Sequence, residues 1–214
     1  MKKTSMIFSL LLFLASCGGG GGGNSASSAP KSAQVSLEEI SPEGNTPLAA
    51  QTFDINLDLK GFKPEHEDKV LEAKELIKQV IASDEFKDKV LNHTYNGKKQ
   101  FADNKGLTNA EVYKKILEGS EMLTPGKNNS MDLQLEPYSD PKSIVIGYTF
   151  KTAKKIWMNT KYLSMYPAAK ITTNMMHEWL HKIGFGHDAK STKKRPYTVP
   201  YAVGYIVRDL AAKM

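Results

Sequence analysis

The residue types with the clearest chemical meaning lie in one short segment, which reads H-E-x-x-H-x-x-G-x-x-H from His177 to His187. Residues four apart share one face of a helix, so His177 and His181 can present two imidazoles to the same metal ion. Glu178 follows the first of them and can reach a water on that metal without becoming a ligand itself. Gly184 permits the left-handed backbone that ends a helix, and the turn beyond it can bring His187 back as the third ligand.

This set of donors points to zinc. Three neutral imidazole nitrogens with one open position describe a catalytic Zn²⁺ site, whereas structural zinc sites are closed by four protein ligands. Three of the five histidines of the chain lie in this one segment. The sequence therefore predicts a Zn²⁺-dependent hydrolase in which His177, His181 and His187 hold the metal and Glu178 is the general base.

The same segment resembles the long zinc-binding motif of the metzincin clan of zinc metallopeptidases at all five defining positions. The resemblance implies hydrolysis of peptide bonds in a protein or peptide substrate. It also implies a twisted mixed β-sheet backed by helices, an active-site helix, and a small C-terminal subdomain that supplies the third ligand. The fold class expected from it is α+β.

One part of the metzincin pattern is missing. Metzincins carry a methionine in a turn beneath the zinc, but the only methionine after His187 is Met214, the last residue of the sequence. The resemblance leaves Val203 as the residue in the place of that methionine. Some members have a tyrosine two residues further on that reaches the zinc or the transition state, which makes Tyr205 a candidate catalytic residue and Tyr201 its rival. A Tyr205 that only packs the terminal helix is the alternative.

Three further residues lie near the motif or are of a type that can bind a metal. Asp188 directly follows the third ligand, where it either orients a ligand or is an exposed loop aspartate. His66 and His93 lie at a helix start and in a loop, and both are expected to be solvated.

The N-terminus has the pattern of an export signal. Lys2 and Lys3 precede a short apolar run that is too short to span a bilayer as a mature helix. The run ends in Leu-Ala-Ser-Cys17, which resembles the lipobox of bacterial lipoproteins, where the chain is cut before a cysteine that then carries lipid. Residues 1–16 are therefore a predicted signal peptide, and Cys17 a predicted lipid anchor in the bacterial cell envelope. An ordinary secretory signal with an incidental cysteine is the alternative.

The composition of the predicted mature chain limits its partners. Residues 17–47 begin with six glycines after Cys17 and are rich in Gly and Ser, as expected for a flexible tether. Cys17 is the only cysteine, so no disulfide is expected. Loss of residues 1–16 removes two lysines and changes the formal charge from +6 to +6 − 2 = +4. These charges are scattered, so we expect no nucleic-acid partner, and we expect a monomer.

The remaining residues, 48–214, are predicted to form one domain with an upper part (48–184) and a short lower part (185–214). Period-two alternation of apolar and polar residues predicts strands, and amphipathic stripes with capping signals predict helices. The expected strands are 53–59, 131–135, 143–150 and 155–159, and the expected helices are 64–82, 84–91, 109–118, 168–183 and 205–213. The 143–150 strand is expected at the edge of the sheet, where an extended peptide could pair with it.

Taken together, the sequence favours a membrane-tethered zinc endopeptidase. A zinc hydrolase that acts on cell-wall peptides is one alternative, and a non-enzymatic surface lipoprotein of the same fold is the other. The intact Glu178 argues against the non-enzymatic alternative, because a chain that had lost its activity would have no need of the base.

Overall fold

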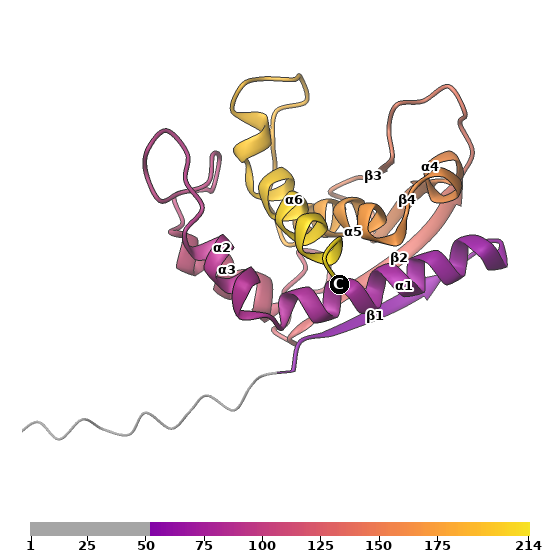
Figure 1. The fold of residues 1–214 in the computed structure, drawn as a ribbon, viewed down its shortest axis with the longest axis horizontal. Coiled ribbons are helices and arrows are strands. Elements are labelled where there is room, and N and C mark those ends of the chain that lie inside the picture. The colour runs from indigo at the N-terminus through magenta and orange to yellow at the C-terminus, as the bar shows by residue number, and fades with distance from the viewer. Residues whose placement is uncertain (1–51) are drawn as a thin grey trace, which may run out of the picture. The chain divides into compact units, whose positions relative to one another are not determined.

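A four-stranded mixed sheet forms the framework of the protein (Figure 1). The computed structural model describes residues 52–214, so the predicted signal peptide, the predicted lipid anchor at Cys17 and the predicted tether lie outside the described residues. The strand order is β1-β2-β4-β3, with β1, β2 and β4 parallel and β3 antiparallel at one edge. The bounds are β1 Asp54–Leu59, β2 Ser130–Tyr138, β3 Gly147–Thr149 and β4 Lys155–Asn159.

Six α-helices in the described residues accompany this sheet, so the expected α+β class is confirmed. Their bounds are α1 Pro64–Ile81, α2 Asp84–Leu91, α3 Asn109–Glu118, α4 Thr160–Met165, α5 Ala168–Lys182 and α6 Val199–Ala211. A single 3-10 turn, Arg195–Tyr197, precedes α6. Within residues 52–214 no helix combines the length and the apolar character that a membrane crossing needs.

The core lies between one face of the sheet and the helices α1, α5 and α6 (Figure 1). Alternate residues of the strands point into it, and among the most deeply buried are Ile55, Met131, Leu133, Leu135, Ile156 and Met158. Buried apolar area of this kind contributes about 25 cal/mol per Å² to folding, which makes this face the main source of stability. The helix that carries the zinc motif, α5, is therefore fixed on the sheet by the core itself.

The strand expected at 143–150 is shorter in the structure and covers only Gly147–Thr149. Side chains in the preceding residues bind backbone amides and form a turn instead. The Asp140 carboxylate accepts hydrogen bonds from the amides of Lys142 and Ser143, both at 3.1 Å, and the Ser143 hydroxyl accepts one from Val145 at 3.0 Å. Local side-chain acceptors of this type compete with strand pairing.

The last helix also differs from the expectation, since it begins at Val199 and not at Tyr205. Pro200 lies in its first turn, where the fixed φ of proline suits a helix and its missing N–H is not needed. The residues around Val203 are therefore helical, and the prediction that they form a turn beneath the metal is wrong. Val203 is fully buried there.

Helix α6 packs closely against α5 beneath the first histidine of the motif. A Cβ on Gly204 would lie 3.1 Å from the Thr173 carbonyl oxygen and 3.8 Å from the Cβ of His177. The absence of a side chain at Gly204 thus sets the distance between the two helices. This contact between α6 and α5 places apolar residues beneath His177.

We predict that Gly204→Val will destabilise the domain by about 1–3 kcal/mol, because the branched side chain must push α6 away from Thr173. Chemical denaturation measures the change in the free energy of unfolding. Gly126→Val is the control, since a Cβ at Gly126 meets no atom within 4 Å. Equal stability of the two variants would contradict the close packing of α6 on α5.

Candidate metal centre

The three histidines of the motif converge on one point. The Nε2 atom of His177 lies 3.1 Å from Nε2 of His187 and 3.2 Å from Nε2 of His181. In residues 52–214 these three form the one group of His, Cys, Asp or Glu whose ligand atoms are close enough to share a metal ion. Helix α5 supplies the first two histidines. Gly184, with φ of 97°, supplies the left-handed turn that returns the chain toward His187.

The other nitrogen of each ring faces a backbone carbonyl. His181 Nδ1 donates to Phe185 O at 2.9 Å, His187 Nδ1 donates to Asp188 O at 2.9 Å, and the His177 ring bonds the Pro200 carbonyl. Three neutral imidazoles carry three N–H groups in total, and these carbonyl contacts use all of them. The three Nε2 atoms therefore present lone pairs to one another.

Lone pairs at such distances repel unless a cation lies between them. Protonation of a ring is opposed here, because burial lowers the pKa of His177 well below 6.5, with a further contribution from the neighbouring histidines, and burial also lowers the pKa of His181. Nitrogen ligands at about 2.05 Å in tetrahedral geometry lie roughly 3.3 Å apart, close to the Nε2 spacing. The donor set fits a divalent transition metal, without fixing which one.

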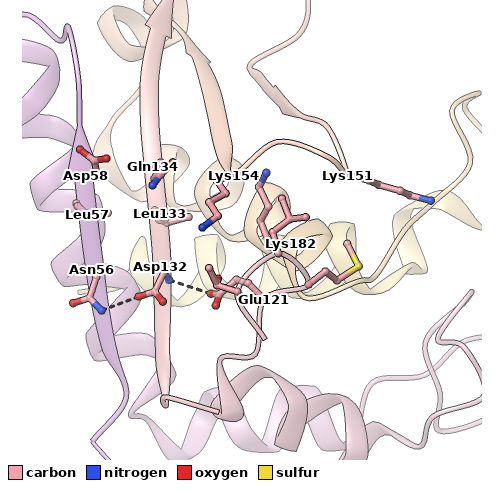
Figure 2. A pocket seen from close by; sticks show the side chains of 13 residues that line it. Asn56, Leu57, Asp58, Glu121, Asp132, Leu133, Gln134, Lys151, Lys154 and Lys182 are labelled. Atoms are coloured by element: carbon pink, nitrogen blue, oxygen red, sulfur yellow. Dashed lines mark hydrogen bonds between the residues drawn. The ribbon is translucent and has the colours of Figure 1, made fainter. Parts of the chain in front are cut away.

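Hydrogen bonds with residues 121 and 122 hold helix α5, which carries His177 and His181, in place. Glu121 Oε1 accepts a hydrogen bond from Trp179 Nε1 at 2.7 Å and another from the Asp132 amide at 3.1 Å. The Met122 amide donates to the Lys182 carbonyl at 2.9 Å. Figure 2 shows Glu121 and Asp132 joined in this way, beside a pocket of about 320 Å³ that Lys182 at the end of α5 also lines. The indole between the first two ligands thus has a fixed partner.

Glu178 is buried beside the histidines, with a side chain only 6% exposed. Asn174 Nδ2 donates to Glu178 Oε1 at 3.4 Å, and the Thr149 amide of β3 also bonds the carboxyl group. Burial raises the pKa of Glu178 to about 8, although the positive charge of Lys182 opposes this shift. The buried carboxyl group is therefore a stronger base than an exposed glutamate.

The histidines and Glu178 open into a cleft of about 550 Å³. One wall is the chain from Ile144 to Thr149, which includes the edge strand β3. The opposite wall carries Arg195 and two tyrosines, Tyr201 and Tyr205. A volume of this size suits a bound ligand of several residues or a small molecule.

Of the two candidate tyrosines, Tyr201 is the one that contacts the metal ligands. Its ring centroid lies 4.5 Å from that of His177 and 4.8 Å from that of His187. Tyr205 also lines the cleft, but its ring is 5.9 Å from Tyr201 and further from the histidines. Burial raises the pKa of the Tyr201 hydroxyl above 10, which keeps it a hydrogen-bond donor at neutral pH.

Asp188 acts on the site through its backbone. Its carbonyl accepts from His187 Nδ1, whereas its carboxylate lies 3.4 Å from the Lys194 ammonium. The two histidines outside the motif are less solvated than expected. His66 is buried and its Nε2 lies 2.9 Å from the Ser164 hydroxyl, and His93 stacks on Phe101 with 4.2 Å between ring centroids.

Comparison with known proteins does not assign a function to the chain. No protein-family model matches the chain, and neither do curated proteins or solved structures. A function for the chain must therefore be inferred from the site.

Sequence reasoning missed several residues of the cleft. Asn174 lies one helical turn before Glu178, a spacing that could have indicated their contact. Arg195 is one of only two arginines in the chain, the other being Arg208. The scarcity of arginine could have marked Arg195 as a candidate residue of the site. The contact between Glu121 and Trp179 spans 58 residues and left no local pattern.

We predict that the folded chain binds one divalent metal ion and that His177→Ala, His181→Ala and His187→Ala each abolish this binding, since each removes one of three nitrogens. Metal per chain after dialysis against Zn²⁺ or Co²⁺ measures it. His66→Ala is the control and keeps its metal. Full metal content in any of the three motif variants would show that the ion is held elsewhere.

We also predict a pH-dependent gain in stability for Glu121→Gln. Burial raises the pKa of Glu121 above 4.5, and its Oε2 atom has no partner. A raised native pKa means that the glutamate's contribution is fully present below the unfolded pKa and is lost as the pH rises through the native pKa. Glutamine keeps an acceptor for Trp179 without acquiring charge.

The free energy of unfolding of both proteins, measured in urea from pH 4 to pH 8 with chelator present, checks this. The free energy of unfolding of Glu121→Gln is expected to exceed that of the wild type by an amount that grows from about pH 4.5 upward. Glu75→Gln, at a side chain that is 60% exposed, is the control. A difference that stays constant over the whole range contradicts the prediction.

Proposed function

We propose that the chain is a zinc-dependent endopeptidase of the metzincin type that hydrolyses peptide bonds in proteins or peptides. The observation that carries the proposal is that three Nε2 atoms and a buried carboxyl group, that of Glu178, meet in one open cleft. Zn²⁺ held by His177, His181 and His187 would supply a bound water with a pKa of about 7 and a Lewis acid for the scissile carbonyl.

The residues of the chain then divide the work. Glu178 takes the proton of the attacking water as general base and passes it to the leaving amine. Asn174, hydrogen-bonded to Glu178 Oε1 at 3.4 Å, restricts the orientation of the carboxyl group. Tyr201, whose ring packs on two of the ligands, donates a hydrogen bond to the carbonyl oxygen as negative charge develops on it. Tyr205 contributes to the wall further along the cleft.

An extended substrate binds by adding a strand to the sheet. β3 pairs with β4 on one side only, since it is the last strand in the order β1-β2-β4-β3. The free side of an edge strand offers backbone N–H and C=O groups to a peptide, which gives affinity without demanding particular side chains. Residues 144–149 line the cleft, so a peptide paired there lies across the histidines.

Export and tethering belong to the same proposal and rest on the sequence of residues 1–47 alone. A lipid on Cys17 and the glycine-rich segment after it would hold the peptidase at the bacterial cell envelope. A location at the cell envelope agrees with a substrate outside the cytoplasm.

We predict that Glu178→Gln will keep its metal but lose peptide cleavage by roughly 10²- to 10⁴-fold, the usual contribution of a general base. Casein, broad peptide pools and purified peptidoglycan serve as substrates for the zinc-loaded protein. Glu136→Gln is the control, because Glu136 pairs with Lys155 at 2.5 Å in the sheet, away from the cleft.

Each outcome decides between the candidates. Cleavage of casein or peptides that needs Glu178 supports the endopeptidase, and release of peptides from peptidoglycan alone assigns the activity to cell-wall bridges. A wild type that is fully loaded with zinc yet inert on every substrate refutes the enzymatic proposal and favours the non-enzymatic surface protein.

A further inference from the structure

One charge in the cleft has no counterpart. Arg195 lines the cleft together with the histidines, and Glu178 is the one acidic residue among the residues that line it. In the described part of the chain Arg195 forms no ion pair, whereas Arg208, the other arginine, lies 2.7 Å from Asp209. The Arg195 Nη1 atom donates to Ala189 O at 3.3 Å, and the Nε atom is buried without a hydrogen-bond partner. A cation in this position is available to a ligand.

The guanidinium is held next to the reacting centre. Its central carbon lies 4.8 Å from the centroid of the Tyr201 ring, and the same ring packs on His177 and His187. Stacking on an aromatic ring restricts the guanidinium plane, so that its edge can face a carboxylate with two parallel hydrogen bonds. A single aromatic ring therefore separates Arg195 from the metal ligands.

The backbone that carries Arg195 is also firmly positioned. The Thr198 amide and hydroxyl both bond the Arg195 carbonyl, at 3.2 and 2.7 Å, and the Arg195 amide donates to Thr192 O at 3.1 Å. The loop at residues 92–107 supports it from outside, because the Ala102 amide donates to Tyr197 O at 2.9 Å. A residue held by so many contacts is well suited to recognition.

The choice of residue type points the same way. The chain has 29 basic residues, of which only Arg195 and Arg208 are arginines. Lysine supplies the charge almost everywhere else on the surface. Arginine differs from lysine in its planar fork of donors, which matches the two oxygens of a carboxylate.

We infer that Arg195 selects the substrate by binding a carboxylate of the peptide close to the bond that is cut. The inference rests on the proposed peptidase function and names its substrate class, which is acidic peptides. The carboxylate comes either from an Asp or Glu side chain or from the C-terminus of the peptide. Both sources present the same two oxygens to the guanidinium, which lies across the cleft from β3.

The test compares matched peptides. A fixed sequence is scanned with Asp or Glu against Asn or Gln at each position, and each peptide is made with a free and with an amidated C-terminus. The zinc-loaded wild type is expected to prefer one carboxylate over its amide about ten- to hundredfold in kcat/KM, as for a hydrogen bond between charged groups. The position or terminus that shows the preference identifies the source.

The variants assign that preference to Arg195. Arg195→Gln is expected to bring the acid-to-amide ratio to about one, Arg195→Lys to keep part of it, and Arg195→Glu to reverse it toward peptides with lysine. Arg208→Gln is the control, and it keeps the wild-type ratio. Unfolding temperature and zinc content are measured for every variant, so a ratio is compared only between folded and loaded proteins.

Binding gives a readout that does not depend on turnover. Calorimetry with the Glu178→Gln protein is expected to show a lower Kd for the preferred acidic peptide than for its amide, and the double variant with Arg195→Gln loses that difference. Peptide cleavage without any acid preference, or with a preference that survives in Arg195→Gln, overturns the inference and leaves the peptidase standing. Binding that discriminates through Arg195 without cleavage refutes the peptidase and leaves the carboxylate site standing.

Discussion

Three lone pairs that face one another across about 3 Å are the constraint on which this molecule is built. Nothing within a neutral protein stabilises such an arrangement, because every N–H of the three imidazoles is already committed to a backbone carbonyl. The surrounding structure must therefore hold the rings in place. The buried face of α5, the close contact of α6 at Gly204 and the bond from Glu121 to Trp179 all serve this purpose.

Different residues of α5 form the cleft and anchor the helix to the rest of the domain. Toward the cleft it presents two ligands and a buried carboxyl group, which are costly to keep in an apolar setting. Trp179 is buried in the core, and Lys182 at the end of the helix lines the second pocket. The Lys182 ammonium donates to the carbonyl of Ala153, between β3 and β4, and to that of Lys155, the first residue of β4. Lys182 thus ties α5 to the strands beside the cleft.

The sequence predicted best the parts of the fold that are determined locally. Helices α2 and α3 and strand β4 have the predicted bounds, because Ser83 caps one helix and Thr108 with Glu111 forms a capping box on the other. The ligand cluster was predicted equally well, since all its residues lie within eleven positions. These are cases in which the deciding contacts are between near neighbours in the chain.

Features decided by distant contacts were missed or misplaced. The close approach of Gly204 to Thr173 depends on how α6 packs on α5. The ring contact of Tyr201 with two histidines could not be ranked above Tyr205 by spacing alone. These features could not be predicted from the sequence, because the spacing of residues within one helix or strand does not show which other elements pack against it.

The three histidines lie within eleven residues of one another, and this short spacing bears on whether the domain folds before or after it binds a metal. A metal that joins residues 177, 181 and 187 closes only a short stretch of chain, so it adds little to the entropy that cross-linking removes from the unfolded state. The core, by contrast, draws on β1, β2 and β4 and on α1, α5 and α6 without using the three histidines. The domain can consequently fold first, and an ion held by the three histidines would bind afterwards. Metal binding would then be a late step, separate from folding.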